Sequence, residues 1–434
     1  MISDVSSRLQ LSSRVLAGVS RRWAWALLLA FAGPALHAQM VLPTPMIEPL
    51  LPAALRAEDP SSRNSALRAG SVSHPGATRP PAPTTPFTYG RLALYPRVSA
   101  AFSYSEGVLS ERGRPTNSYI SSVSAGFRFD AGRNWALDYG TGWTLYSSRR
   151  FKNSPNHNLT FSGALPFRIW EGSFSQGYNY SRAPRIETGR QTERQTVTTS
   201  GILARALGTK LTLQTGLSQS LSFISASPDS YSWSSSNALQ YRLGETASLG
   251  GTLAVSYVDV NPGVNMAALT PGGRFAWAVS PRLTMNLLAG TDYRWIFSRG
   301  VKSPSTPVFQ VGGNYQLFDH TSLSASASRS INPSSFRNQL TDGLSVQLGF
   351  SQRLLGVIQV TGSYGEQISG YNATRLGVES GRKDHAYFYA LNAATTVLRR
   401  INVSVGFSAT DNSSNRRGYG FNSRTYSVQG GFGF

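Results

Sequence analysis

Apolar and polar residues alternate along most of the chain after residue 90. In the segment 283–297, Leu283, Leu287 and Trp295 fall on one face, and Asn286 and Asp292 fall on the other. A period of two residues is typical of β-strands, whose successive side chains point to opposite faces. The same phasing occurs in 135–145, 249–257, 309–317, 344–350, 358–364, 387–397, 401–407 and 426–434. The pattern predicts many strands, each with one apolar and one polar face.

Short turn-forming segments recur about every 38 residues between these strands. They centre near Gly132, Phe167, Gly208, Gly244, Pro281, Asp319, Arg353 and Arg399. Longer and more charged connections alternate with them, at 106–117, 147–156, 182–193, 225–230, 259–269, 298–306, 331–342, 368–384 and 411–422. Eight turns and nine long connections predict nine hairpins and therefore eighteen strands.

Aromatic residues gather at both ends of the apolar faces. Trp135 and Phe432 lie near short turns, whereas Tyr257 and Trp295 lie near long connections. Two aromatic girdles, an even strand number, short turns at one rim and long loops at the other are typical of bacterial outer-membrane barrels. Residues 91–434 are therefore predicted to form an all-β transmembrane antiparallel up-and-down barrel of about 18 strands, with short periplasmic turns and long extracellular loops.

Other β architectures fit the pattern less well. A propeller would need four short strands per repeat of about 40 residues, whereas each half-repeat here is one run. A secreted β-sandwich adhesin or a solenoid remains open, because single strands look alike in all of them. Its outward face should be polar, however, and one polar face per strand is already assigned to the interior.

The first 90 residues have a different composition. Arg21 and Arg22 precede an apolar core at 23–32 and a small residue, Ala38, which together predict a signal peptide at 1–38. The segment ahead of the arginines is long for such a signal, so the true start codon stays open. Residues 39–90 are rich in Pro and are predicted to be a disordered periplasmic tail of unassigned role.

Composition limits the chemistry that the chain can perform. It has no Cys, which excludes disulfides, thiolate metal sites and a lipidated cysteine. Only 14% of residues are charged, against about 25% in an average soluble protein. His157, His320 and His385 are isolated from one another, and no triad or metal-spaced cluster stands out. We therefore expect no enzymatic activity, no cofactor and no metal.

The polar faces carry a modest set of charges among many Ser, Thr, Gly, Asn and Gln. Parity along the strands predicts lumen positions for Arg97, Arg128, Asp138, Glu171, Arg274, Asp292 and Arg294. Eighteen strands enclose a bore wide enough for water. We expect a porin-like channel for small polar solutes or for export of polysaccharide. The alternative is a structural or adhesive surface barrel whose loops close it.

The predicted extracellular loops are basic, in keeping with a net charge of +20. Their basic residues include Arg112, Arg114, Arg149, Arg150, Lys152, Arg182, Arg185, Arg190, Arg382, Lys383, Arg416 and Arg417. We expect them to meet outer-membrane lipids and the phosphates of lipopolysaccharide. A funnel for an anionic polysaccharide is the sharper alternative. Nucleic acid is not an expected partner at this location.

The final segment alternates aromatic and small residues, with Tyr426, Phe432 and Phe434 on one face. It resembles the terminal strand of outer-membrane barrels, which the barrel assembly machinery recognises. Over residues 91–434, motifs such as Phe127-Arg128-Phe129, Tyr241-Arg242-Leu243 and Phe432-Gly433-Phe434 resemble the β-barrel porins associated with exopolysaccharide gene clusters. The resemblance implies passive diffusion or polymer export across the outer membrane, and it names no substrate.

Overall fold

The computed structural model describes residues 87–434, apart from 112–113, 133, 168, 186–189, 226, 299–304, 335, 376–377, 379, 398–399 and 434. The described residues belong to one compact unit. The predicted signal peptide (1–38), residues 39–86 of the predicted tail and Phe434 lie outside the described part. Within that part, no helix is long and apolar enough to cross a membrane.

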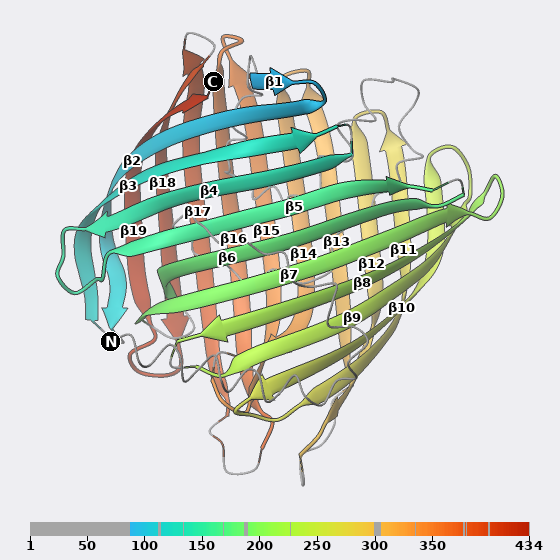
Figure 1. Cartoon of the computed structure of the whole chain (residues 1–434). Coiled ribbons are helices and arrows are strands. Elements are labelled where there is room, and N and C mark those ends of the chain that lie inside the picture. Colours follow the sequence, from blue (N-terminus) through green and yellow to red (C-terminus); the bar gives the residue numbers. More distant parts are fainter. Residues whose placement is uncertain are drawn as a thin grey trace. The chain divides into compact units, whose positions relative to one another are not determined.

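The described chain forms β-strands joined by short connections (Figure 1). The strands are β1 Phe87–Tyr89, β2 Leu92–Glu111, β3 Arg114–Ala131, β4 Trp135–Tyr146, β5 Ser154–Pro166, β6 Glu171–Arg185, β7 Arg190–Ala206, β8 Leu211–Ile224, β9 Asp229–Arg242, β10 Ala247–Asn261, β11 Met266–Ser280, β12 Leu283–Ile296, β13 Ser305–Phe318, β14 Thr321–Pro333, β15 Gln339–Leu354, β16 Ile358–Ala373, β17 Arg382–Val397, β18 Ile401–Ser414 and β19 Phe421–Gly433. The sheet thus begins at Phe87, inside the range assigned to the tail.

Strands β2 to β19 form a closed barrel. Each pairs antiparallel with the next along the chain, and β19 returns to pair with β2 from Gly433 opposite Arg97 to Arg424 opposite Glu106. This gives eighteen antiparallel strands, as predicted. The short β1 pairs with Leu92 to Leu94 of β2, just beyond the end of β19. Closure leaves the barrel strands without a free edge, so their backbone groups are paired from strand to strand.

The two faces of the barrel wall differ in polarity, as the alternation predicted. Trp143, Leu217 and Val405 point outward and are 57%, 66% and 56% exposed. Their neighbours by parity point inward and are mostly Ser, Thr, Gly, Asn and Gln. A continuous exposed apolar belt around a closed barrel is suited to lipid and not to water. The protein is therefore one of the outer membrane.

Two details of the connections differ from expectation. The segments expected as long loops are in large part strand: β2 and β3 leave only residues 112–113 between them, and β6 ends at Arg185 before β7 begins at Arg190. The seventh short turn was expected at Arg353 and lies at residues 355–357 instead, because Leu355 and Gly356 take the positive φ values of 50° and 70°. Glycine accepts that conformation without steric cost.

Outward glycines provide space for aromatic rings on the neighbouring strand. Phe350 lies directly opposite Gly362, and a Cβ added to Gly362 would come within 2.1 Å of the Phe350 ring. Trp135 covers Gly163 in the same way, and its ring stacks on Phe161 with centroids 5.1 Å apart. The ring thus replaces the missing side chain on the lipid-facing surface.

We predict that Gly362→Val destabilises the barrel by about 1–3 kcal/mol, because Phe350 must leave its low-energy position. Urea unfolding in detergent micelles, followed by the heat-modifiable gel mobility of folded barrels, measures the effect. The control is Gly251→Ala, since a Cβ at that strand position meets no atom within 4 Å. Equal midpoints for the two variants would contradict the packing role of Gly362.

Candidate functional site

The inner face of β13 to β18 is a wall of uncharged polar residues, which we call the uncharged wall. Its inward positions carry mostly Ser, Thr, Asn, Gln, Gly and Ala, with the aromatic residue Phe388 among them, from Arg353 near the short turns to Arg382 and Asp384 near the opposite rim. Asn314, Ser324 and Ser326 point inward and are nevertheless solvent-exposed. Solvent therefore reaches this wall at mid-height.

The predicted lumen charges lie mainly on the other strands, and most of them are paired. Arg97 Nη1 donates to Asp138 Oδ2 at 2.8 Å across β3, passing over Gly126, which leaves room for the guanidinium. Arg128 Nε donates to Asp130 Oδ1 at 2.7 Å. Sequence reasoning missed Asp130 as a lumen residue, although it shares the parity of Arg128. These pairs bring opposite charges together on the wall.

The remaining predicted lumen residues occupy separate places. Arg274 Nη1 donates to Gln214 Oε1 at 3.4 Å, a contact that reaches from β11 to β8. Glu171 points inward at the start of β6 and is exposed. Structure and parity agree on the inward direction of both residues, but they do not form one cluster.

A buried ion pair lies on the inner face of β12 near the extracellular rim. Arg294 Nε and Nη2 donate to Asp292 Oδ1 and Oδ2 at 3.1 and 2.8 Å, and the two side chains are 6% and 8% exposed. Arg294 Nη2 also donates to the backbone oxygen of Ile331 on β14 at 3.2 Å. The pair therefore joins β12 to the end of a strand that is not its neighbour.

The end of the β14–β15 hairpin folds into the extracellular mouth. Leu340, with Ile331 packed beside it, belongs to an apolar cluster with the inward residues Val258, Met266 and Ile296. Ile331 and Leu340 have the parity of outward residues in their strands. Their contact with the inner face of β10 to β12 therefore requires the hairpin end to bend inward.

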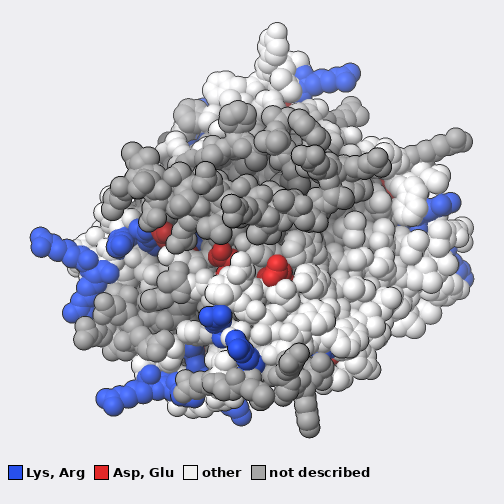
Figure 2. Space-filling model, turned by 60° about the horizontal axis from the view of Figure 1, so that its bottom comes forward, with Lys and Arg blue, Asp and Glu red and all other residues white. Residues whose placement is uncertain are grey.

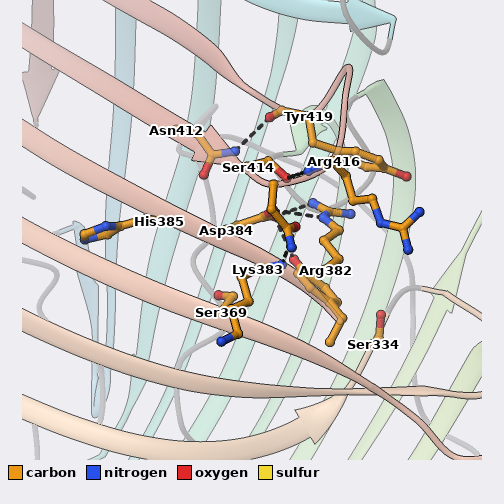
Figure 3. A network of polar contacts seen from close by, with 12 residues as sticks. Ser334, Ser369, Arg382, Lys383, Asp384, His385, Asn412, Ser414, Arg416 and Tyr419 are labelled. Atoms are coloured by element: carbon orange, nitrogen blue, oxygen red, sulfur yellow. Dashed lines mark hydrogen bonds and ion pairs between the residues drawn. The ribbon is translucent and has the colours of Figure 1, made fainter. Parts of the chain in front are cut away.

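A second buried ion pair holds the other side of this hairpin. Arg382 Nε donates to Asp384 Oδ1 at 2.9 Å (Figure 3). Tyr371 Oη donates to Asp384 Oδ2 at 3.3 Å. The Arg382 guanidinium lies 4.3 Å from the centre of the Tyr371 ring, 3.5 Å from that of Tyr419 and 5.6 Å from that of Phe336. Cations are attracted to aromatic faces at such distances.

These five residues, Phe336, Tyr371, Arg382, Asp384 and Tyr419, form what we call the mouth latch. They come from the β14–β15 connection, β16, β17 and the β18–β19 connection. Asn412 Nδ2 donates to the backbone oxygen of Tyr419 at 2.8 Å and fixes the last of these segments. The latch and the Asp292–Arg294 pair thus hold the β14–β15 end from two sides at the mouth.

The residues expected as basic loop positions occupy different environments. The prediction that Arg382 is an extracellular loop residue is wrong. Arg382 is the first residue of β17, points inward and is buried in an ion pair with Asp384. Arg182 lies on β6 and is paired with Glu193 of β7. Arg150 Nη1 donates to Thr116 Oγ1 at 3.1 Å.

Most of the other predicted basic residues lie in or next to connections between strands, as expected, and the rest are outside the described part. Arg149 and Lys152 lie in the β4–β5 connection, Lys383 points outward from β17, and Arg416 and Arg417 lie in the β18–β19 connection. Figure 2 shows Lys and Arg projecting around the outline of the face formed by the bottom of Figure 1, with a few carboxylates further in. Arg112 and the side chains of Arg114, Arg185 and Arg190 are outside the described set.

His157, His385, Tyr426 and Phe432 face the outside of the barrel. His385 Nε2 lies 2.6 Å from Glu366 Oε1, and His157 meets the edge of Tyr180. No group of three or more His, Asp or Glu side chains in the described part is arranged to hold a metal ion. Tyr426 packs on Phe407 with ring centroids 5.1 Å apart, and Phe432 lies opposite Ile401 and Val98.

No family model matches the chain, and no curated protein matches its sequence. Several solved structures are similar in fold. The outer membrane protein OpdK of Pseudomonas aeruginosa is 11% identical over 79% of this chain and 99% of its own, with a TM-score of 0.42. OccK2 (OpdF) of the same species, solved with glucuronate, is 11% identical over 79% of this chain and 98% of its own, with a TM-score of 0.43.

A longer chain is similar to the same degree. The FrpB iron transporter of Neisseria meningitidis is 11% identical over 74% of this chain and 63% of its own, with a TM-score of 0.42. At these identities and TM-scores no family and no substrate can be assigned from the similar structures. The function is therefore inferred from the geometry of the lumen and the mouth.

We predict that Asp384→Ala loosens the mouth latch. The substitution leaves the buried Arg382 charge uncompensated, which typically costs about 3–5 kcal/mol. Trypsin cleavage after Arg416 and Arg417, followed by mass spectrometry on the detergent-solubilised barrel, should then accelerate at least tenfold. Glu366→Ala, which removes the outward contact with His385 from the adjacent strand, serves as the control. Unchanged cleavage in Asp384→Ala would show that the latch does not hold the β18–β19 connection.

Proposed function

We propose that this protein is an outer-membrane channel through which small polar solutes diffuse. The observation that carries the proposal is the combination of a lipid-facing apolar belt with a polar, solvent-exposed inner wall in one closed barrel. Barrels of 16–18 strands generally leave an aqueous channel. A barrel needed only as a membrane anchor or an adhesin has no use for a wide hydrophilic interior.

The inward bend of the β14–β15 end makes the channel a gated one in this proposal. The β14–β15 end lies between the inner face of β10 to β12 and the mouth latch. Separation of the latch would withdraw Phe336 from Arg382 and widen the opening.

The same contacts support the rival proposal, a non-conducting surface barrel, if the latch never opens. Export of a polysaccharide would need the mouth to open further than diffusion of a small solute does.

The proposed partners follow from the location of charged and aromatic residues. Arg149, Lys152, Arg416 and Arg417 are proposed to contact the phosphates of lipopolysaccharide at the outer rim. The terminal strand β19, with Tyr426 and Phe432 on its outer face, is proposed to be the segment that the barrel assembly machinery recognises. No catalytic step is part of the proposal, since diffusion needs only an open path.

We predict a small ionic conductance for the purified full-length protein in planar lipid bilayers, and a severalfold larger one for Phe336→Ala. Removing the Phe336 ring frees the hairpin end from Arg382 without leaving a buried charge. Tyr389→Ala, an outward substitution on β17, is the matched control and should conduct like the unaltered protein. Absence of current in the unaltered protein and in Phe336→Ala alike would exclude the channel.

A further inference from the structure

We infer that the uncharged wall contains a subsite for a neutral sugar residue, so that the preferred solutes are uncharged oligosaccharides. This inference rests on the proposed channel function and adds the chemical class of its solute. It depends on three features of the described residues: a hollow lined by hydroxyl and amide groups, an aromatic ring beside it, and the pairing of charges elsewhere in the lumen.

The hollow lies in the inner face of β13 to β17 and has a volume of about 130 Å³. Its polar lining includes Asn314, Ser324, Ser351, Thr361, Ser363 and Asn392. Gly349 lies between Ser324 and Ser363 in the register, and a Cβ there would come within 2.6 Å of Ser324 Oγ. The glycine thus keeps the hollow open.

The hollow also has unused hydrogen-bonding capacity. Thr361 Oγ1 is buried and has no hydrogen-bond partner among the described residues. A buried hydroxyl without a partner costs free energy, and rotation of the Thr361 side chain toward the hollow would let a ligand hydroxyl bond to it and recover that cost. Asn392 lies directly opposite Thr361 and offers both a donor and an acceptor. Neighbouring hydroxyl and amide groups of this kind match the adjacent hydroxyls of a sugar ring.

An aromatic ring is available next to the hollow. Phe388 points into the lumen from β17, two residues from Ala390, which lines the hollow. Gly365 lies opposite Phe388 on β16 and adds no side chain beside the ring. A half-buried aromatic face in a polar channel packs well against the C–H face of a sugar, while its hydroxyls bond to the polar groups. Hydroxyl groups alone would bind water as well as a sugar, so the aromatic ring is what favours the sugar.

The distribution of charge selects against ionic solutes at this place. No inward residue of β13 to β18 that is described carries a charge between Arg353 and the Arg382–Asp384 pair. An anion there would lose water without gaining a cationic partner, which is costly. Arg97, Arg128 and Arg294 on other strands already hold carboxylates. Arg274 is bonded to Gln214 and lies on β11, outside the uncharged wall.

The test measures block of ionic current by sugars in planar bilayers, using Phe336→Ala as the background if the unaltered channel conducts too little. Maltotriose should reduce the current reversibly at a concentration at least tenfold below that needed for trigalacturonate. Phe388→Ala should raise the blocking concentration of maltotriose at least tenfold, with block measured relative to the sugar-free current of the same variant. Tyr389→Ala, the outward neighbour, should leave the block unchanged, and gel mobility confirms that each variant is folded.

The outcomes separate the subsite from the channel. If current flows but trigalacturonate blocks better, or Phe388→Ala behaves like the unaltered protein, the subsite is overturned and the channel stands. If no current flows in any variant, the channel is excluded, and calorimetric titration of the detergent-solubilised barrel with maltotriose decides the subsite. Heat of binding that Thr361→Val and Phe388→Ala both abolish supports the subsite, and no measurable heat in the unaltered barrel overturns it.

Discussion

Complete pairing of the backbone is the constraint on which the structure depends. In lipid there is no water to satisfy an open N–H or C=O group, so a sheet can cross the membrane only when it closes on itself. Closure here joins residues more than three hundred positions apart, as in the hydrogen bond between the hydroxyls of Ser105 and Thr425. The seam between β19 and β2 therefore completes the barrel, and every other strand pair is local in sequence.

Closure also fixes the division between the two solvents. Once the strands are paired in register, each side chain must point either to lipid or to the lumen. Outward positions then hold large apolar residues, or a glycine covered by a neighbouring ring, as at Gly362 and Phe350. Inward positions carry small polar residues, and the charges among them persist mainly where an Arg and an Asp lie within reach, as at Arg97 and Asp138.

Alternation and repeat length suffice to predict the strand number, the two faces and the inward direction of residues such as Arg128 and Asp292. The odd or even position of a residue sets the face of the sheet to which its side chain points, and this rule holds as long as the strand is regular. It fails for the inward bend of the β14–β15 end, because Ile331 and Leu340 keep outward parity while packing on an inner face. The contacts of Arg382 with Phe336 and Tyr419 are equally hidden, since these rings lie in the connections of two other hairpins.

Strand β1 has a consequence for association between barrels. Beyond the last residue of β19, the N-terminal end of β2 would present free backbone groups that another polypeptide could extend by strand addition. The three residues of β1 occupy that position and leave an outer border too short to template further growth. The sheet is thereby protected against edge-to-edge aggregation at this end of the seam between β19 and β2.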